Sequence, residues 1–168
     1  RIGGAIARDL AADGWGVAVH FQESGEEADS VVNDIRTSGG NAVAIQGELS
    51  QDSAPEKLIN EATNKLGFLT CLVNNASVFE SDTIETATPE SWNLHLKTNL
   101  QAPFFLTQGF SEMLPEGVAG NIINLLDQRV WNLTPYFASY TVSKSGLWTL
   151  TQSLALALAP RIRVNGIG

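Results

Sequence analysis

Tyr140 and Lys144 are the residues of this sequence whose types and spacing point most directly to chemistry. They are four residues apart, which places them on one face of a helix, one turn from each other. An ammonium group held near a phenol stabilises the phenolate and lowers the pKa of the phenol. The tyrosine could then exchange a proton with a substrate carbonyl or imine near neutral pH. An exposed surface pair without any chemical role is the alternative interpretation.

Three further places carry polar residues that suit a ligand-binding edge. Asn74–Ser77 follows an apolar run at 69–73, and its small side chains would let a ligand approach the backbone. Asp127 ends the apolar run 120–126, and Asn99 lies inside a long helical pattern, where asparagine is a mediocre helix former. Each place also has a purely structural explanation, as a turn or a local packing contact.

The elements that must position these residues alternate along the chain. Helical patterns occur at the start of the chain and at 25–38, 52–66, 88–113 and 139–159, and β-rich runs at 16–21, 41–46, 69–74, 120–126 and 162–167. Two of these runs are almost continuously apolar, as strands covered on both faces by crossover helices should be. The sequence therefore predicts an α/β fold with a doubly wound parallel sheet, a three-layer sandwich in a single domain over 1–168. Ligands of such sheets bind beyond the carboxyl ends of the strands.

Composition restricts the classes of function. The 168 residues carry a net charge of −8, with a sequence pI near 4.6, which argues against a nucleic-acid partner. The sequence contains no long apolar run and no signal-peptide pattern, so we expect a cytoplasmic protein without a membrane partner. One cysteine, Cys71, and two histidines, His20 and His95, cannot build a disulfide framework or a Cys/His metal cluster. The chemistry is therefore expected to be organic.

The segment Asn74–Ser77, Asn99 and the segment Ser139–Lys144, in this order and spacing, resemble the short-chain dehydrogenase/reductase family. The resemblance implies an NAD(P)-binding Rossmann domain and an oxidoreductase. It also implies roles for three residues: Tyr140 as general acid/base, Lys144 as the group that lowers the pKa of Tyr140 and holds the nicotinamide ribose, and Asn99 as the residue that positions a water in a proton relay.

Within that family the chain resembles the pteridine reductases. They share an aspartate at the position of Asp127, where the family usually has serine. The segments Asn74–Phe79 and His20–Ser24 add to this likeness. By the same resemblance Phe79 would stack on a pterin ring, and Ser77 would lie near both substrate and cofactor. Asp127 would be a second proton donor beside Tyr140. The alternative for Phe79 is a loop residue packed under the next helix, and for Asp127 a plain cap of the loop 127–138.

The resemblance favours NADPH over NADH as the cofactor. A carboxylate at the tip of the second strand would bind a ribose diol, whereas the strand 16–21 ends without an acid, and Ser24 and Arg1 could reach a 2′-phosphate. Glu23 argues the other way, because the matching position is often basic. The expected cofactor residues are Arg1, Ile2, His20, Phe21, Ser24, Glu48, Leu49, Asn75, Ala76, Ser77, Tyr140 and Lys144, with Glu48 and Leu49 at the adenine.

Only Arg1, Ile2 and Gly3 match the end of the glycine-rich turn with which the family begins. We therefore expect an excerpt of a longer chain, without the first strand and its pyrophosphate loop and without the last strand and the substrate lid. The missing first strand would lie between the strands 16–21 and 69–74.

Three functions remain open from the sequence. The first is an NADPH-dependent reductase of a pterin or dihydropteridine, and the second a reductase of another carbonyl substrate, such as a 3-oxoacyl thioester, a sugar or an alcohol. The third is a catalytically silent nucleotide-binding subunit. The helices 88–113 and 139–159 carry apolar residues on more than one face, and in related enzymes these helices build a dimer within a tetramer. A homotetramer through them is therefore expected.

Overall fold

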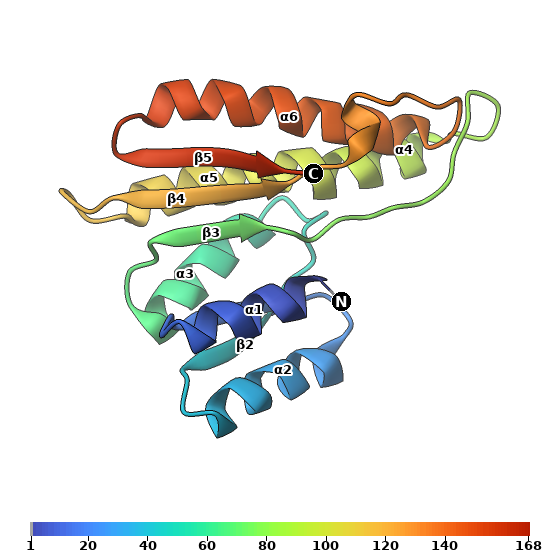
Figure 1. The fold of residues 1–168 in the computed structure, drawn as a ribbon. Helices are drawn as coiled ribbons and strands as arrows, with labels where there is room; N and C mark the ends of the chain where they lie inside the picture. The colour runs from blue at the N-terminus through green and yellow to red at the C-terminus, as the bar shows by residue number, and fades with distance from the viewer. Residues whose placement is uncertain (1) are drawn as a thin grey trace. The chain divides into compact units, whose positions relative to one another are not determined.

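The computed structural model describes residues 2–168, so Arg1 and the role expected for it lie outside the described part of the chain. The chain divides into two compact units, Arg1–Leu69 and Thr70–Gly168. Each unit holds its own parallel sheet with helices against it (Figure 1). The expectation of one domain over the whole chain remains a prediction.

The first unit contains three helices and two strands. In chain order they are α1 (Ile2–Ala12), β1 (Val17–Phe21), α2 (Gly25–Thr37), β2 (Ala42–Gln46) and α3 (Ala54–Leu66). The strands pair in parallel from Val17 opposite Ala42 to Phe21 opposite Gln46. The core of the unit joins α1, α2 and β2 through the small and branched side chains Ala7, Val31, Val32, Ile35 and Ala42.

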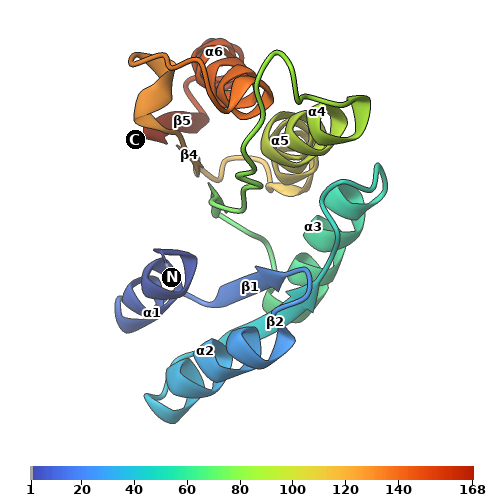
Figure 2. The ribbon, with the colours of Figure 1, turned by 90° about the vertical axis from the view of Figure 1, so that its right-hand side faces the viewer.

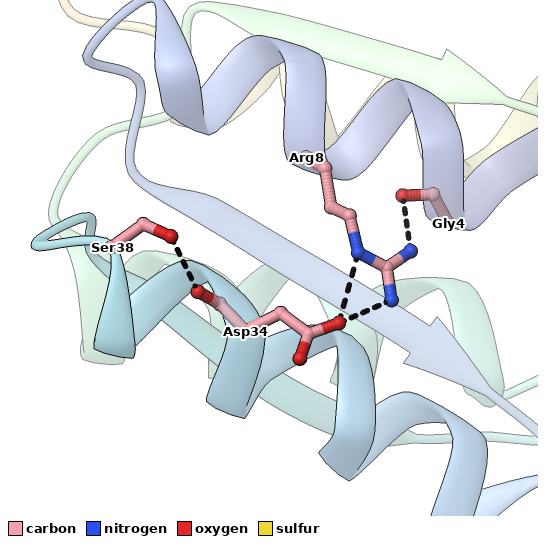
Figure 3. A network of polar contacts seen from close by, with 4 residues as sticks. All are labelled: Gly4, Arg8, Asp34 and Ser38. Carbon is pink, nitrogen blue, oxygen red and sulfur yellow. Dashed lines mark hydrogen bonds and ion pairs between the residues drawn. The ribbon is translucent and has the colours of Figure 1, made fainter.

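A polar contact on the surface links α1 to α2 (Figure 3). Arg8 donates hydrogen bonds of 2.6 and 3.1 Å to Oδ2 of Asp34 and one of 3.1 Å to the carbonyl oxygen of Gly4. About half of each charged side chain is exposed, so the pair contributes little to stability. A hollow beside this pair, lined by α1 and α2, contains none of the predicted site residues.

The second unit contains three strands and three helices, with a π-helical and a 3₁₀ turn. In chain order they are β3 (Cys71–Asn74), α4 (Pro89–Leu96), the π-helical η1 (Lys97–Gln101), α5 (Ala102–Met113), β4 (Gly120–Leu125), the 3₁₀ turn η2 (Gln128–Val130), α6 (Ala138–Leu158) and β5 (Ile162–Ile167). The sheet has the order β3-β4-β5, all parallel. Figure 2 shows α4 and α6 next to each other, and both α5 and α6 contact the sheet.

The predicted elements are present with small changes. All five β-rich runs are strands, and the expected helix 139–159 is α6. The expected continuous helix 88–113 is instead α4, η1 and α5, because its middle forms a π-helical turn. The strands form two sheets, β1-β2 and β3-β4-β5, and the expected further strand between β1 and β3 stays a prediction. Among residues 2–168, no helix is both long enough and apolar enough to cross a membrane.

Candidate active site

Asp127, Tyr140 and Lys144 come together at the carboxyl end of β4. Asp127 follows β4, whereas Tyr140 and Lys144 lie in the first two turns of α6. The Tyr140 hydroxyl donates a hydrogen bond of 2.9 Å to Oδ2 of Asp127, and Nζ of Lys144 donates one of 2.8 Å to the carbonyl oxygen of Leu125. Tyr140 is 5% exposed and Lys144 is 3% exposed. The alternative of an exposed surface pair therefore does not hold.

The Tyr140 hydroxyl is harder to ionise than that of a free tyrosine. Burial is the main cause, and Asp127 adds to it by accepting the hydrogen bond and by its negative charge, so the pKa of Tyr140 is raised. Nζ of Lys144 lies 5.9 Å from the centre of the Tyr140 ring. Burial and the directly bonded carboxylate set the direction of this shift, and the expected lowering of the Tyr140 pKa by Lys144 stays a prediction.

Lys144 is itself shifted by its surroundings. Burial lowers the pKa of Lys144 to about 8, while the negative charge of Asp127 opposes the shift. One N–H of its ammonium bonds to Leu125, and the other two have no protein partner among the described residues. Lys144 therefore retains donors with which it can hold a ligand hydroxyl.

Asp127 has two structural roles at once. Its Oδ1 accepts a hydrogen bond of 2.8 Å from the N–H of Arg129, which makes Asp127 the N-cap of η2. The guanidinium Nη1 of Arg129 lies 3.7 Å from the same oxygen, and Oδ2 accepts from Tyr140. Asp127 therefore caps the loop, as one interpretation of the sequence has it, and also contacts Tyr140. Both of its oxygens accept hydrogen bonds in this arrangement, and its expected role as a second proton donor stays a prediction.

Asn99 anchors a loop. Its Oδ1 accepts a hydrogen bond of 2.8 Å from the N–H of Val78, and its Nδ2 donates to the Val78 carbonyl at 2.9 Å and to Oγ of Ser143 at 3.1 Å. Both amide hydrogens of the buried side chain are thus used within the protein. The amide N–H groups of Asn99 therefore have no hydrogen left to bond the water that Asn99 was expected to position. Asn99 lies in η1, and π-helical turns are frequent at functional sites.

Phe79 lies at the Tyr140 side chain and is half exposed. Its ring stacks on the ring of Phe137, with centroids 4.5 Å apart and planes 1° apart, and meets the Tyr140 ring edge-on at 4.7 Å. The Arg129 guanidinium lies 5.3 Å from the Phe79 ring centre and 4.6 Å from that of Phe137. Phe79 is 52% exposed, so it is not packed under the next helix.

Arg129 and Phe137 were not among the predicted site residues. The place of Arg129, two residues after Asp127, is a signal that could have suggested it. Phe137 has a left-handed backbone with φ of 60°, which is uncommon for a residue other than glycine, and its sequence gives no sign of this. Nε of Arg129 is buried and has no hydrogen-bond partner within the described residues.

Asn75, Ala76 and Ser77 begin the loop after β3. Asn75 and Ala76 are half-buried, and Ser77 is exposed. The Ser77 hydroxyl interacts with Tyr140 and lowers its pKa, an effect smaller than the opposing one of burial. Ser77 is therefore close to the Tyr140 hydroxyl, and its expected place near both substrate and cofactor stays a prediction.

The other expected cofactor residues lie in the first unit. Nε2 of His20 bonds to the Gly47 carbonyl at 2.8 Å, and burial lowers the pKa of His20, so the neutral ring must carry its hydrogen on Nε2. Glu48 accepts a hydrogen bond of 2.5 Å from Ser50, a residue the sequence did not suggest. Ser24 precedes α2 without capping it through its side chain. The remaining three differ in exposure: Ile2 is exposed, Phe21 is half-buried and Leu49 is buried.

The chain belongs to the short-chain dehydrogenase family, whose sequence pattern it matches over residues 1–168. This confirms the resemblance, the Rossmann-type α/β fold and the assignment to the oxidoreductases.

Three comparisons show how near its relatives are. A crystal structure described as FolM alternative dihydrofolate reductase 1 from Brucella canis, complexed with NADP, is 43% identical and superposes with a TM-score of 0.96; the match covers 100% of this chain and 68% of that one. An uncharacterised oxidoreductase of Methylorubrum extorquens is 39% identical over 98% of this chain and 66% of its own length. A 3-oxoacyl-[acyl-carrier-protein] reductase of Synechocystis is 31% identical over 99% of this chain and 68% of its own length. The chain thus spans about two thirds of these relatives.

Proposed function

We propose that the protein is an NADPH-dependent reductase of a pterin or dihydropteridine, with Tyr140 as the proton donor. The observation that carries the proposal is the hydrogen bond of 2.9 Å from Tyr140 to Asp127, with the exposed Phe79 ring at its side. A ring C=N bond needs a proton on nitrogen as hydride reaches carbon. A hydroxyl and a carboxyl group in contact can share that proton between them.

Phe79 supports a flat aromatic substrate. Its ring is edge-on to Tyr140 and half exposed, so a planar heteroaromatic ring that stacks on it would also lie beside the phenol. The parallel ring of Phe137 already covers Phe79 at 4.5 Å, which leaves no room for a further ring between them. A substrate ring would therefore use the other face of Phe79 or displace Phe137.

The residues present fit NADPH. Lys144 has two donors without protein partners, which suits the hydroxyls of a ribose. β1 ends at Phe21 without an acid and Ser24 offers a hydroxyl three residues further on, although Glu23 beside it is acidic. When bound, NADPH would supply the hydride. The similar FolM structure is described as a complex with NADP, which supports the choice of the phosphorylated cofactor.

The second candidate is a reductase of 3-oxoacyl thioesters. It is supported by the Synechocystis reductase, 31% identical to this chain. Asp127 discriminates between the two, because reduction of a carbonyl needs one hydrogen-bond donor at oxygen, which Tyr140 alone can supply. The third interpretation, a silent nucleotide-binding subunit, is disfavoured by the intact set of Tyr140, Lys144 and Asn99.

We further propose a cytoplasmic homotetramer that associates through the helices at 88–113 and 139–159. Large apolar side chains are exposed on these helices: Trp92, Phe104, Phe105, Met113, Val142 and Leu156. A second protein surface would remove them from water. Light scattering that gives a monomer mass at micromolar concentration would contradict the tetramer, and cell fractionation would test the location.

The deciding experiment measures NADPH oxidation by the full gene product with dihydropterins, 3-oxoacyl thioesters and sugars. We expect turnover of dihydropterins with the highest kcat/KM. Faster turnover of an oxoacyl thioester would establish the second candidate. No turnover of any substrate, with NADPH binding retained, would establish the silent subunit.

A further inference from the structure

The loop that carries Phe79 is held at alternate residues by the helices beside it. Val78 is bound through both backbone groups by Asn99, and the N–H of Glu80 donates a hydrogen bond of 3.1 Å to Nε2 of His95. Two residues further on, the buried Asp82 bonds to the start of α6. The segment 78–82 is therefore fixed at three points, and Phe79 projects from between two of them.

Asp82 caps the helix that carries Tyr140, although it lies far from that helix in sequence. The carbonyl oxygen of Asp82 accepts hydrogen bonds from the N–H groups of Phe137 at 2.7 Å and Ala138 at 3.4 Å. Its Oδ1 accepts from the N–H of Ser139 at 3.2 Å, and its Oδ2 accepts from the Ser139 hydroxyl. The first residues of a helix have N–H groups without partners in the helix, and α6 has no side-chain cap of its own at Phe137. Asp82 supplies the missing cap, and a negative charge favours this end of a helix.

His95 connects the loop at Glu80 to the start of α6 at Ser139. The ring nitrogen of His95 that carries the hydrogen can be assigned from its partners. Nε2 faces the N–H of Glu80, which can only donate, so Nε2 carries no hydrogen. Nδ1 must then carry it, and Nδ1 lies 2.9 Å from the Ser91 carbonyl and 2.8 Å from Oγ of Ser139. His95 is fully buried, its Nε2 accepts from Glu80, and its single Nδ1 hydrogen is shared between the Ser91 carbonyl and Oγ of Ser139.

These contacts end at the proposed active site. Ser139 precedes Tyr140 in α6, and the His95 ring lies edge-on to the Tyr140 ring with centroids 6.0 Å apart. The Tyr140 ring therefore contacts both the Phe79 ring and the His95 ring. The cluster of Asp82, His95 and Ser139 holds these two contacts in place.

We propose that Asp82, His95 and Ser139 are positioning residues that hold the Tyr140 hydroxyl on Asp127 and Phe79 beside it. None of the three contacts the reacting atoms. Their effect on turnover rests on the proposed function, but their effect on the orientation of Tyr140 does not.

The test compares Ser139→Ala with Thr151→Val in the full gene product. Thr151 is a matched control, because it is a buried hydroxyl of the same helix that donates to the Leu147 carbonyl at 2.7 Å and accepts from Asn124 at 2.8 Å. Both variants remove one buried hydroxyl and should lower Tm. Only Ser139→Ala should lower kcat, by about tenfold, because a small displacement of the proton donor slows the reaction, with NADPH affinity unchanged.

A second readout needs no substrate. Ionisation of Tyr140 can be followed by ultraviolet absorbance, as the difference between a variant and the same variant carrying Tyr140→Phe. Ser139→Ala should let Tyr140 ionise at lower pH than in the native protein, because its contact with Asp127 loosens, whereas Thr151→Val should not. If Ser139→Ala does not fold, Ser139→Cys keeps nearly the same shape with a weaker donor and should shift both readouts in the same direction.

The outcomes separate the two proposals. Equal Tyr140 ionisation and equal kcat in the Ser139 and Thr151 variants would overturn the positioning role. An unchanged ionisation with a lowered kcat would also overturn it. A native protein that turns over no dihydropterin, but whose Ser139 variants shift Tyr140 ionisation, would overturn the proposed function and leave the positioning role standing.

Discussion

The hydroxyl of Tyr140 donates its hydrogen to Oδ2 of Asp127 at 2.9 Å, so the proton proposed for transfer lies between a phenol and a carboxylate. The carboxylate keeps this proton on Tyr140 until a substrate atom replaces Asp127 as the acceptor. Serine at the same position would lack the negative charge that has this effect. The first two predictions follow from this contact.

Tyr140→Phe should lower turnover by about 100-fold or more, because the proton donor is lost while the ring remains. NADPH binding should be unchanged, since the hydroxyl is bonded to Asp127 and the ring contacts with Phe79 and His95 stay. Lys144→Ala, as a comparison, should weaken both. Steady-state kinetics and NADPH titration check the contrast, and unaltered turnover of Tyr140→Phe would remove Tyr140 from proton transfer.

Asp127→Ser should lose most dihydropterin reduction while any carbonyl reduction survives. A serine can bond a carbonyl oxygen, but it cannot share the Tyr140 proton as the Asp127 carboxylate does, and a ring nitrogen needs that proton as hydride reaches the neighbouring carbon. Asp127→Asn is the control for the loop, because its Oδ1 can still accept from the N–H of Arg129 and cap η2. The measurement is kcat with a dihydropterin for all three proteins. Equal kcat values for the three proteins would contradict a role of Asp127 in dihydropterin reduction and would favour reduction of another carbonyl substrate.

Lys144→Met should remove a pH-dependent part of the stability. Burial lowers the pKa of Lys144 to about 8 from its ordinary value of 10.5, so between these values the folded chain binds fewer protons at this site than the unfolded chain. The free energy of unfolding should therefore rise with pH in this window, by about 2 kcal/mol between roughly pH 7.5 and pH 9.5. Denaturant unfolding of the cofactor-free native protein and of Lys144→Met measures the difference. If the free energy of unfolding depends on pH equally in the native protein and in Lys144→Met, Lys144 is not buried in the folded chain in a way that lowers its pKa.

Phe79→Leu should raise KM for a dihydropterin by about fivefold, the value of one aromatic contact. The half-exposed ring contributes little to the core, so Tm should change by only a few degrees. Phe68→Leu is a matched control, because Phe68 is 57% exposed and lies outside the site. If both variants have the native KM, Phe79 does not bind substrate.

The part of the site that could be predicted depends on local spacing and on the sheet. Tyr140 and Lys144 share a helix face because they are one turn apart, and Asp127 comes near them because the carboxyl ends of parallel strands meet at one edge. The α/β fold was predictable for a similar reason, since the apolar runs and helical periods alternate regularly.

The remainder depends on contacts between distant segments. Asp82 and Ser139 are 57 residues apart, and the sequence around neither of them predicts that Asp82 caps a helix. The raised pKa of Tyr140 could not be read from the sequence either, because it results from burial and from the direction of one hydrogen bond.

The π-helical turn η1 makes the length of its helix critical. The N–H of Ala102 bonds to the carbonyl of Lys97, five residues back, so this turn holds one residue more than an α-helical turn would. Removal of that residue would restore a regular helix and rotate everything after it by about 100° relative to everything before it. His95 could then no longer face the loop while Phe110, in α5, remains in the core. A relative whose aligned sequence is one residue shorter in this helix must hold its loop by other means, so such a gap in an alignment would mark a branch of the family with a different site.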